Sequence, residues 1–218
     1  MALAIFDLDN TLIGGDSDHL WGEFLIRHNY VDGEFYQKEN DRFYREYQHG
    51  SLDIHDWLEF QLKPLAAHSL TELQQWRKDF IEEEIHPILL PKAAELIDTH
   101  RRKGDRLLII TATNSFITEP IASILGITDL IATDPELIDG EYTGAVYGIP
   151  SYQDGKIDRL NSWLKQQDVT MDGSCFYSDS HNDLPLLKIV DNPVAVDPDN
   201  ILMDTAKERE WPIISLRS

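Results

Sequence analysis

The sequence predicts an α/β fold, a Rossmann-like, doubly wound parallel sheet with a helical cap inserted after the first strand. Short apolar runs that end in polar residues alternate with helical patterns, and this alternation is typical of parallel sheets. Between residues 16 and 85 the alternation stops, because apolar positions there recur at helical spacing among aromatic and charged residues. We therefore expect a core domain of residues 1–15 and 86–218 and a cap domain of residues 16–85.

Local signals near the N-terminus predict the first strand and one of the cap helices. The apolar run from Ala2 to Leu8 is typical of a buried parallel strand. In the cap, Leu58 and Leu62 lie on one face of a predicted helix. We expect Ser51 to cap this helix and Pro64 to end it, because serine accepts a backbone hydrogen bond and proline cannot donate one.

After the cap, strands and helices are expected to alternate up to the C-terminus. Pro91 is pre-organised for a first helical turn, glycine suits the residue after a helix, and Asp-Gly favours a two-residue hairpin. The expected elements are a helix from Pro91 to Gly104, a strand from Arg106 to Ala112, a helix from Phe116 to Leu125 closed by Gly126, a strand from Leu130 to Thr133, a hairpin at Asp139-Gly140, a helix from Lys156 to Gln167, and strands from Cys175 to Ser178 and Pro193 to Val196.

Composition and charge narrow the classes of partner. The chain has 218 residues and a formal net charge of −20, with 42% hydrophobic residues, which is enough to form a core. So acidic a surface repels nucleic acids and anionic membranes, and we expect neither as a partner. Cys175 is the single cysteine, the N-terminus has no basic region, and no apolar run approaches the roughly 20 residues that span a bilayer. We expect a cytoplasmic protein.

Polar side chains stand at or just beyond the ends of the predicted strands. The carboxyl ends of parallel strands meet at one edge of a sheet, so these residues are expected to lie together. Four carboxylates in one place need cations, and magnesium prefers oxygen ligands and phosphate. A lysine would add positive charge, and a threonine hydroxyl a hydrogen bond to a phosphoryl oxygen. The residues in question are Asp7, Asp9, Thr111, Lys156, Asp179 and Asp183.

These motifs, in this order, resemble the haloacid dehalogenase superfamily: Asp7-Leu8-Asp9-Asn10-Thr11 after a strand, then Thr111, Lys156, and Asp179 with Asp183. The insertion after the first motif resembles the phosphoserine-phosphatase-like branch, subfamily IB. The resemblance implies the haloacid dehalogenase fold and a phosphatase that depends on magnesium. It makes Asp7 the nucleophile that forms an aspartyl phosphate, and Asp9 the general acid and base.

The same resemblance assigns ligands to the metal and to the phosphate. Magnesium would bind Asp7, the backbone carbonyl of Asp9, and Asp179, while Asp183 and Asn182 would support the metal shell. Thr111 and Lys156 are expected to contact the phosphate, together with Ala112, Thr113 and Asn114 around the end of the second core strand. Asn114 has an alternative, because asparagine also caps helices and one is expected to follow.

The cap is expected to choose the leaving group. Asp16 lies nine residues after the nucleophile, at the offset where phosphoserine phosphatases contact the substrate amine. Alignment of the glycine-x-leucine steps puts Gln61 where those enzymes carry a carboxylate-binding arginine, and residues 49–66 contain no arginine. An amine contact without a carboxylate contact favours a phosphorylated amino alcohol. Histidinol phosphate comes first, because the branch includes bacterial histidinol-phosphate phosphatases that the chain resembles.

Several alternatives stay open at this point. Phosphoserine, phosphoethanolamine and phosphocholine are other candidate substrates. A phosphotransferase would use the same two aspartates, Asp7 and Asp9, and pass the phosphate to an acceptor alcohol. A phosphate-binding module without catalysis is disfavoured, because such a protein would be expected to have lost one of the catalytic residues, and all of them are present.

Overall fold

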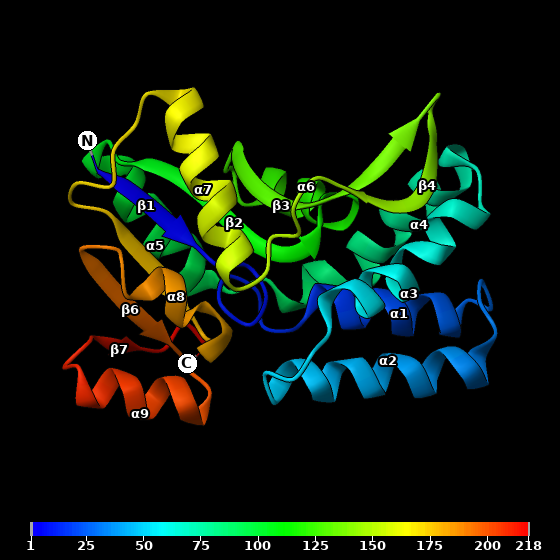
Figure 1. Cartoon of the computed structure of the whole chain (residues 1–218), viewed down its shortest axis with the longest axis horizontal. Coiled ribbons are helices and arrows are strands. Elements are labelled where there is room, and N and C mark those ends of the chain that lie inside the picture. Colours follow the sequence, from blue (N-terminus) through cyan, green and yellow to red (C-terminus); the bar gives the residue numbers. More distant parts are fainter. Residues whose placement is uncertain (1, 218) are drawn as a thin grey trace.

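Seven strands form one sheet in residues 2–217, the part of the chain that this computed structural model describes (Figure 1). Their order across the sheet is β4-β3-β2-β1-β5-β6-β7, and every neighbouring pair is parallel except β3 and β4. The predicted doubly wound parallel sheet is therefore confirmed. The strands are β1 Leu3–Phe6, β2 Arg106–Asn114, β3 Asp129–Ile138, β4 Glu141–Tyr147, β5 Cys175–Ser178, β6 Asn192–Val196 and β7 Ile213–Ile214.

Helices cover both faces of this sheet and form a separate group between β1 and α5 (Figure 1). The helices are α1 Ser17–Arg27, α2 Gly33–Gln48, α3 Ile54–Ala67, α4 Leu70–Phe80, η1 Ile81–Ile85, η2 His86–Ile88, α5 Pro91–Lys103, α6 Ser115–Ile124, α7 Asp154–Gln167, η3 His181–Asp183, α8 Leu184–Leu187 and α9 Asn200–Glu208. No strand interrupts the helices between β1 and β2, as expected for a helical insertion.

Most predicted elements are present, and the turn signals act where expected. Gly104 ends α5 in the left-handed conformation, with φ 76°. Asp139 and Gly140 join β3 to β4, with φ 53° and 85°, as a two-residue hairpin turn requires. The first strand is shorter than predicted, since it ends at Phe6. By contrast, β2 reaches Asn114 because its last residues pair with β3.

Two predictions about α3 are wrong. Asp53, rather than Ser51, caps this helix, because its carboxylate accepts hydrogen bonds from the backbone N–H groups of His55 and Asp56. Pro64 lies inside α3 and does not end it. The Pro64 side chain is buried, and the turn around it stays helical, so tertiary packing outweighs the backbone hydrogen bond that proline cannot make.

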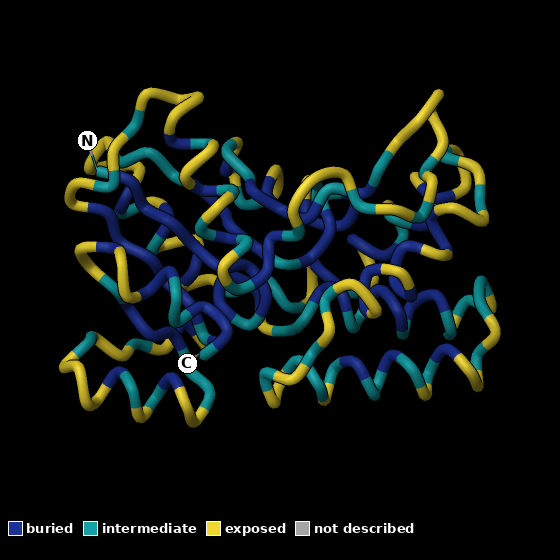
Figure 2. Tube along the Cα trace, viewed as in Figure 1, coloured by how far each residue is buried: buried dark blue, intermediate teal, exposed yellow. Residues whose placement is uncertain are grey.

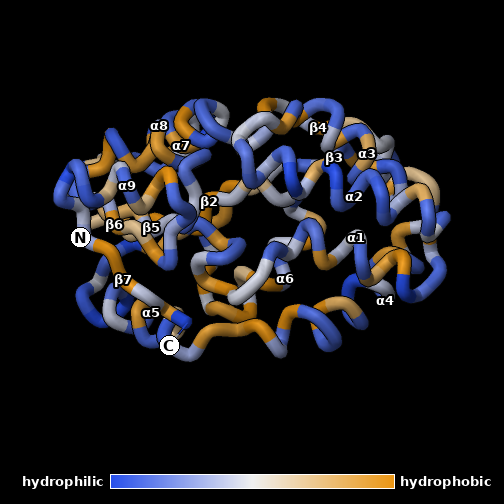
Figure 3. The backbone as a smooth tube through the Cα atoms, turned by 90° about the horizontal axis from the view of Figure 1, so that it is seen from below, coloured by the Kyte–Doolittle hydropathy of each residue, from blue (hydrophilic) through white to orange (hydrophobic). Residues whose placement is uncertain are grey.

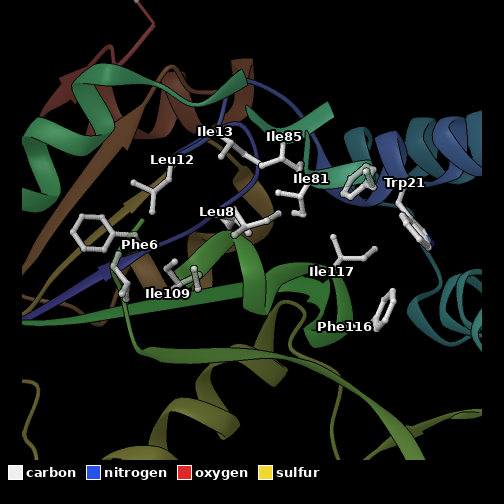
Figure 4. Packing of buried hydrophobic residues seen from close by; sticks show 14 of the residues in the cluster. Phe6, Leu8, Leu12, Ile13, Trp21, Ile81, Ile85, Ile109, Phe116 and Ile117 are labelled. Atoms are coloured by element: carbon white, nitrogen blue, oxygen red, sulfur yellow. The ribbon is translucent and has the colours of Figure 1, made fainter. Parts of the chain in front are cut away.

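Alternate residues of the strands feed two hydrophobic clusters, one on each face of the sheet. Ile5 and Leu108 belong to the cluster under α7, α8 and α9. Phe6 and Ile109 belong to the other cluster, which includes residues of α5 and α6. Figure 4 shows this second cluster continuing from Phe6 past Ile117 toward Trp21 of α1. Because one hydrophobic cluster runs through both parts, the division into core and cap stays a prediction.

Two connecting segments and one hairpin link the α1–α4 group to the sheet. Ile13 and Leu89 form an antiparallel bridge, so the β1–α1 connection and the η2–α5 connection run side by side. The β3–β4 hairpin extends beyond the sheet and packs on α3 (Figure 1), where Gly144 lies against Ala66. The hairpin therefore adds a wall to the α1–α4 group that the sequence pattern did not indicate.

The α2 helix is strongly polar and only partly buried, unlike the central strands of the sheet. Figure 2 shows β1 buried throughout, whereas α2 is buried only at intervals, and Figure 3 colours most of α2 hydrophilic and most of β2 hydrophobic. The buried residues of α2 are Tyr36, Asn40 and Phe43. Within residues 2–217 we find no helix with the length and apolar character needed to cross a bilayer.

Candidate active site

The predicted catalytic residues meet at the carboxyl edge of the sheet. Parallel pairing places β1 between β2 and β5, so residues that follow these strands are neighbours. Asp7 directly follows β1, and its N–H donates to Tyr177 O at 2.9 Å, which continues the ladder with β5. Asp179 directly follows β5, and Thr111 lies near the end of β2.

Lys156 lies between two buried carboxylates at this edge. Its Nζ is 2.9 Å from Asp7 Oδ1 and 2.6 Å from Asp183 Oδ1. Ser178 donates to the second oxygen of Asp183 at 2.7 Å, which orients that side chain. Burial opposes the lysine charge, but Asp183 and Asp7 outweigh it and raise the pKa of Lys156. The lysine is therefore a fixed positive charge beside Asp7.

The Asp7 carboxyl is held in a strongly perturbed environment. Burial raises its pKa to about 7, and although Lys156 opposes this rise, the charges of Asp183 and Asp9 add to it. Lys156 occupies Oδ1, which leaves Oδ2 for a substrate or a cation. A carboxylate in such surroundings gains more from a nearby cation than one in water does, because the local dielectric constant is low.

Asp9 is fixed by donors from both the insertion and the second strand. Ser17 N donates to Asp9 Oδ1 at 2.6 Å, and Thr113 Oγ1 donates to Asp9 Oδ2 at 2.8 Å. Thr111 Oγ1 lies 3.4 Å from the same Oδ2 and accepts from Thr113 N at 3.2 Å. The two threonines thus orient Asp9, and the expected contact between Thr111 and a phosphoryl oxygen stays a prediction.

The donor set beside Asp7 fits a magnesium ion. Asp179 accepts a hydrogen bond from Thr11 at 3.3 Å, which leaves most of its lone pairs free. Burial, followed by the charges of Asp7 and Asp183, raises the pKa of Asp179 well above its usual value. Within residues 2–217, no cluster of three or more His, Cys, Asp or Glu side chains has metal-ligand spacing. The resemblance implies only two carboxylate ligands, from Asp7 and Asp179, with the Asp9 backbone carbonyl as the third, and this ligand set stays a prediction.

Asn182 joins the core to the α1–α4 group. Its Nδ2 donates to Tyr47 O of α2 at 3.1 Å, and its Oδ1 accepts from Tyr152 and Gln153 at 3.2 Å each. These bonds occupy the side-chain amide on both ends. Its expected place in the metal shell stays a prediction, while the contact that the structure gives it is between core and cap.

A pocket lies between this edge and the α1–α4 group. Asp7 and Asp9 lie at one end of it, together with Thr111, Ala112 and Thr113. The cap supplies acidic and aromatic side chains, namely Asp16, Asp18, His19, Phe43, Tyr44, Tyr47 and Trp57. Neither lysine nor arginine is among the described residues that line the pocket.

Asp16 caps the first helix and also lines the pocket, and its contact with a substrate amine stays a prediction. Its Oδ1 accepts from His19 N at 2.9 Å, which caps α1. Burial, followed by the charge of Asp9, raises the pKa of Asp16 well above its usual value. An amine in the pocket would therefore stabilise the ionised carboxylate of Asp16.

Gln61 does not line the pocket, although the sequence suggested that it faces the substrate. Its Nε2 donates to Asp18 Oδ1 and to Asp18 O, so it supports a second acid. Trp57 Nε1 donates to Asp18 Oδ2 at 3.1 Å, and Asn114 Nδ2 donates to Oδ1 at 3.4 Å. Asn114 also caps α6, which was the alternative role, and its expected contact with the phosphate stays a prediction. Asp18 was missed because an acid in a first helical turn is ordinarily explained by the helix dipole.

Comparison with known proteins identifies the family. The haloacid dehalogenase-like hydrolase family matches residues 4–188. The chain belongs to this family. Members of the family typically depend on Mg²⁺. A Neisseria meningitidis protein named histidinol-phosphatase is 47% identical to the chain, with 99% of each covered. Phosphoserine phosphatase SerB1 of Mycobacterium tuberculosis is 31% identical over 99% of this chain and 71% of its own length.

Solved structures agree with the family at the level of the fold. A Bordetella pertussis protein described as of unknown function superposes with a TM-score of 0.93 and 42% identity, covering 99% of this chain and 98% of that one. A phospho-aspartyl intermediate analogue of phosphoserine phosphatase superposes with a TM-score of 0.72 and 18% identity, covering 99% and 93%. The chain is thus a phosphoric monoester hydrolase of the phosphoserine-phosphatase-like branch.

Proposed function

We propose that the chain hydrolyses histidinol phosphate to histidinol and inorganic phosphate, with Mg²⁺ and through an aspartyl phosphate on Asp7. The observation that carries this proposal is the end-to-end 47% identity with the Neisseria histidinol-phosphatase. A pocket that joins the predicted catalytic edge to an acidic, aromatic cap supports it, because the proposed leaving group carries an amine and an aromatic ring.

Asp7 is the proposed nucleophile. Its free Oδ2 attacks phosphorus while the bond to the leaving alkoxide breaks, and the product is an acyl phosphate on Asp7. Lys156 holds Oδ1 and keeps the attacking oxygen toward the pocket. The lysine also lowers the repulsion between the carboxylate and the phosphate oxygens. Bound Mg²⁺ would supply further positive charge, held by the Asp7 and Asp179 carboxylates and the Asp9 carbonyl.

Asp9 is the proposed general acid and base. In the first step it gives a proton to the leaving alkoxide, and in the second it takes one from the water that attacks the acyl phosphate. Phosphate then leaves, and Asp9 is protonated again for the next turnover. The hydrogen bonds from Ser17 N and Thr113 Oγ1 fix the carboxyl group within the pocket. Ala112 and Thr113, on the same wall, are proposed to contact the phosphate.

The leaving group is proposed to bind in the cap, with its amine at Asp16. Asp16 lines the pocket, and the N–H of the next residue, Ser17, donates to Asp9 Oδ1. An amine bound at Asp16 would therefore lie close to the ester oxygen that Asp9 is proposed to protonate. A substrate carboxylate finds no lysine or arginine on the described lining of the pocket. A buried charge without a partner costs several kcal/mol, so phosphoserine is the weaker candidate.

Steady-state release of phosphate from four monoesters tests the proposal. Histidinol phosphate is expected to have the highest kcat/KM, ahead of phosphoethanolamine, phosphocholine and phosphoserine. In Asp16→Asn, amine-bearing substrates are expected to lose activity while p-nitrophenyl phosphate, which has no amine, is spared. A wild-type preference for phosphoserine would contradict the substrate, and transfer of phosphate to added alcohols in place of release would contradict hydrolysis.

A further inference from the structure

The Asp18 carboxylate is a pre-oriented acceptor on the cap side of the pocket. It lies in the first turn of α1, is 8% exposed, and accepts from side chains of two further elements. Trp57 and Gln61 reach it from α3, and Asn114 reaches it from the end of β2. A carboxylate has about four acceptor positions, and Trp57 takes only one of the two on Oδ2. One position on Oδ2 therefore remains for a ligand.

The charges along the pocket favour a leaving group with two hydrogen-bond donor groups. Asp7 and Asp9 belong to the phosphate end, where Lys156 lies against Asp7. Asp16 and Asp18 are left facing the leaving group, and the described lining offers no lysine or arginine to neutralise either of them. Burial raises the pKa of Asp18 to about 7, with Asp9 adding to the rise and the Gln61 hydrogen bond opposing it. A positively charged or N–H-donating ligand group relieves this cost.

We propose that Asp18 binds the ring N–H of an imidazole, while Asp16 binds the amine of the same leaving group; this rests on the proposed function. Gln61 is then a positioning residue, because it holds the Asp18 carboxylate and does not line the pocket. Trp57 also holds this carboxylate, from the wall of the pocket. Gln61 contributes to specificity because it holds the Asp18 carboxylate, whereas phosphoserine phosphatases were expected to carry a carboxylate-binding arginine at the position of Gln61.

Contacts at both Asp16 and Asp18 distinguish candidate substrates that an amine contact at Asp16 alone would not distinguish. Phosphoethanolamine and phosphocholine each offer one positive group, so they occupy Asp16 and leave Asp18 without a partner. Phosphoserine places a carboxylate among these acids. An amino-alcohol phosphate with an imidazole is the one among the candidates that supplies a donor to both carboxylates. Asp18 therefore acts as a specificity residue for the ring and plays no part in cleaving the ester.

The test compares Asp18→Asn with wild type on histidinol phosphate, phosphoethanolamine and p-nitrophenyl phosphate. A hydrogen bond to a charged group predicts a loss in kcat/KM of about 10- to 100-fold on histidinol phosphate. The two substrates without an imidazole are expected to change less than about threefold. Asp56→Asn is the matched control, since Asp56 is an exposed acid in the first turn of α3, and we expect wild-type kinetics from it.

Gln61→Met gives a second route in case Asp18→Asn fails to fold, because Gln61 does not line the pocket. It removes the Nε2–H donor to Asp18 and keeps the length of the side chain, so we expect a smaller loss that is again confined to histidinol phosphate. Equal losses on all three substrates, or none on histidinol phosphate, would overturn the role of Asp18. A wild-type enzyme that does not prefer histidinol phosphate would instead overturn the proposed function, so the two failures are distinguishable.

Discussion

Lys156 Nζ lies 2.9 Å from Asp7 Oδ1, although 149 positions separate the two residues in the chain. The same ammonium lies 2.6 Å from Asp183 Oδ1, and all three side chains are buried. Two buried acids therefore share one cation at this edge of the sheet. Removing that cation would leave the two carboxylates close together without compensation.

Lys156→Met is expected to destabilise the fold by about 3–5 kcal/mol, as removal of one partner from a buried ion pair does, and to abolish turnover. Denaturant unfolding measures the first effect and phosphate release the second. The double variant Lys156→Met, Asp183→Asn is expected to recover part of the stability and none of the activity. Lys165→Met is the control, because Lys165 is an exposed residue of the same helix, α7. Equal stability of Lys156→Met and wild type would contradict the shared-cation arrangement.

Asp7→Asn is expected to fold and to lose turnover by more than about 1,000-fold, because the amide cannot form the acyl phosphate. In wild type, beryllium fluoride is expected to inhibit as a phosphate analogue that attaches to Asp7, and the variant should not respond to it. Circular dichroism checks that the fold persists. Substantial activity in Asp7→Asn would show that the reaction does not pass through this residue.

Asp9→Asn is expected to slow alkyl phosphates by about 100- to 10,000-fold, the usual contribution of general acid catalysis. Activated aryl phosphates should lose much less, because their leaving groups need no proton. Thr113→Val removes the 2.8 Å hydrogen bond to Asp9 and should show a weaker form of the same bias. The measurement is kcat/KM across leaving groups of graded pKa. A uniform loss across that series would exclude Asp9 as the acid.

Removal of magnesium with EDTA is expected to abolish activity and to lower the unfolding temperature. A ligand that binds only the folded state adds about 2.7 kcal/mol of stability at 100 times its Kd. Asp179→Asn is expected to lose this stabilisation, because it removes one of the two proposed carboxylate ligands. Thermal unfolding at several magnesium concentrations measures the effect without any turnover. Unchanged melting of wild type across these concentrations would contradict the proposed site.

Because of Asp18, the free energy of unfolding is expected to fall as the pH rises toward the neutral range. Burial raises the pKa of Asp18 to about 7 in the folded chain, from its ordinary value of 3.8. Between pH 3.8 and pH 7 the folded chain therefore holds a proton that the unfolded chain has lost. Stability decreases with pH wherever the folded state binds more protons, by up to about 4 kcal/mol over the full window. Asp18→Asn is expected to lose less stability than wild type between pH 5 and pH 7.5. Parallel pH curves for both proteins would contradict the perturbed pKa.

Signals between neighbouring residues were enough to predict most of the fold. The apolar runs, Gly104 and the Asp139-Gly140 turn predicted elements that the structure contains, because periodicity and turn chemistry act over a few positions. The meeting of the polar residues at one edge of the sheet was predicted as well, because parallel strands bring their carboxyl ends together. Asp7 and Lys156 are accordingly in contact, as expected from their places in the sequence.

The cap depended on contacts that no local pattern contains. Asp53 rather than Ser51 caps α3, and Pro64 stays inside that helix, because packing against the rest of the fold outweighs propensity. Gln61 meets Asp18 across 43 positions, so its role as a support for an acid follows only from how α1 and α3 pack. The sequence by itself determined the sheet and which residues meet at its carboxyl edge. The tertiary structure alone decided which cap side chains line the pocket, because partners distant in the chain are selected by packing and burial.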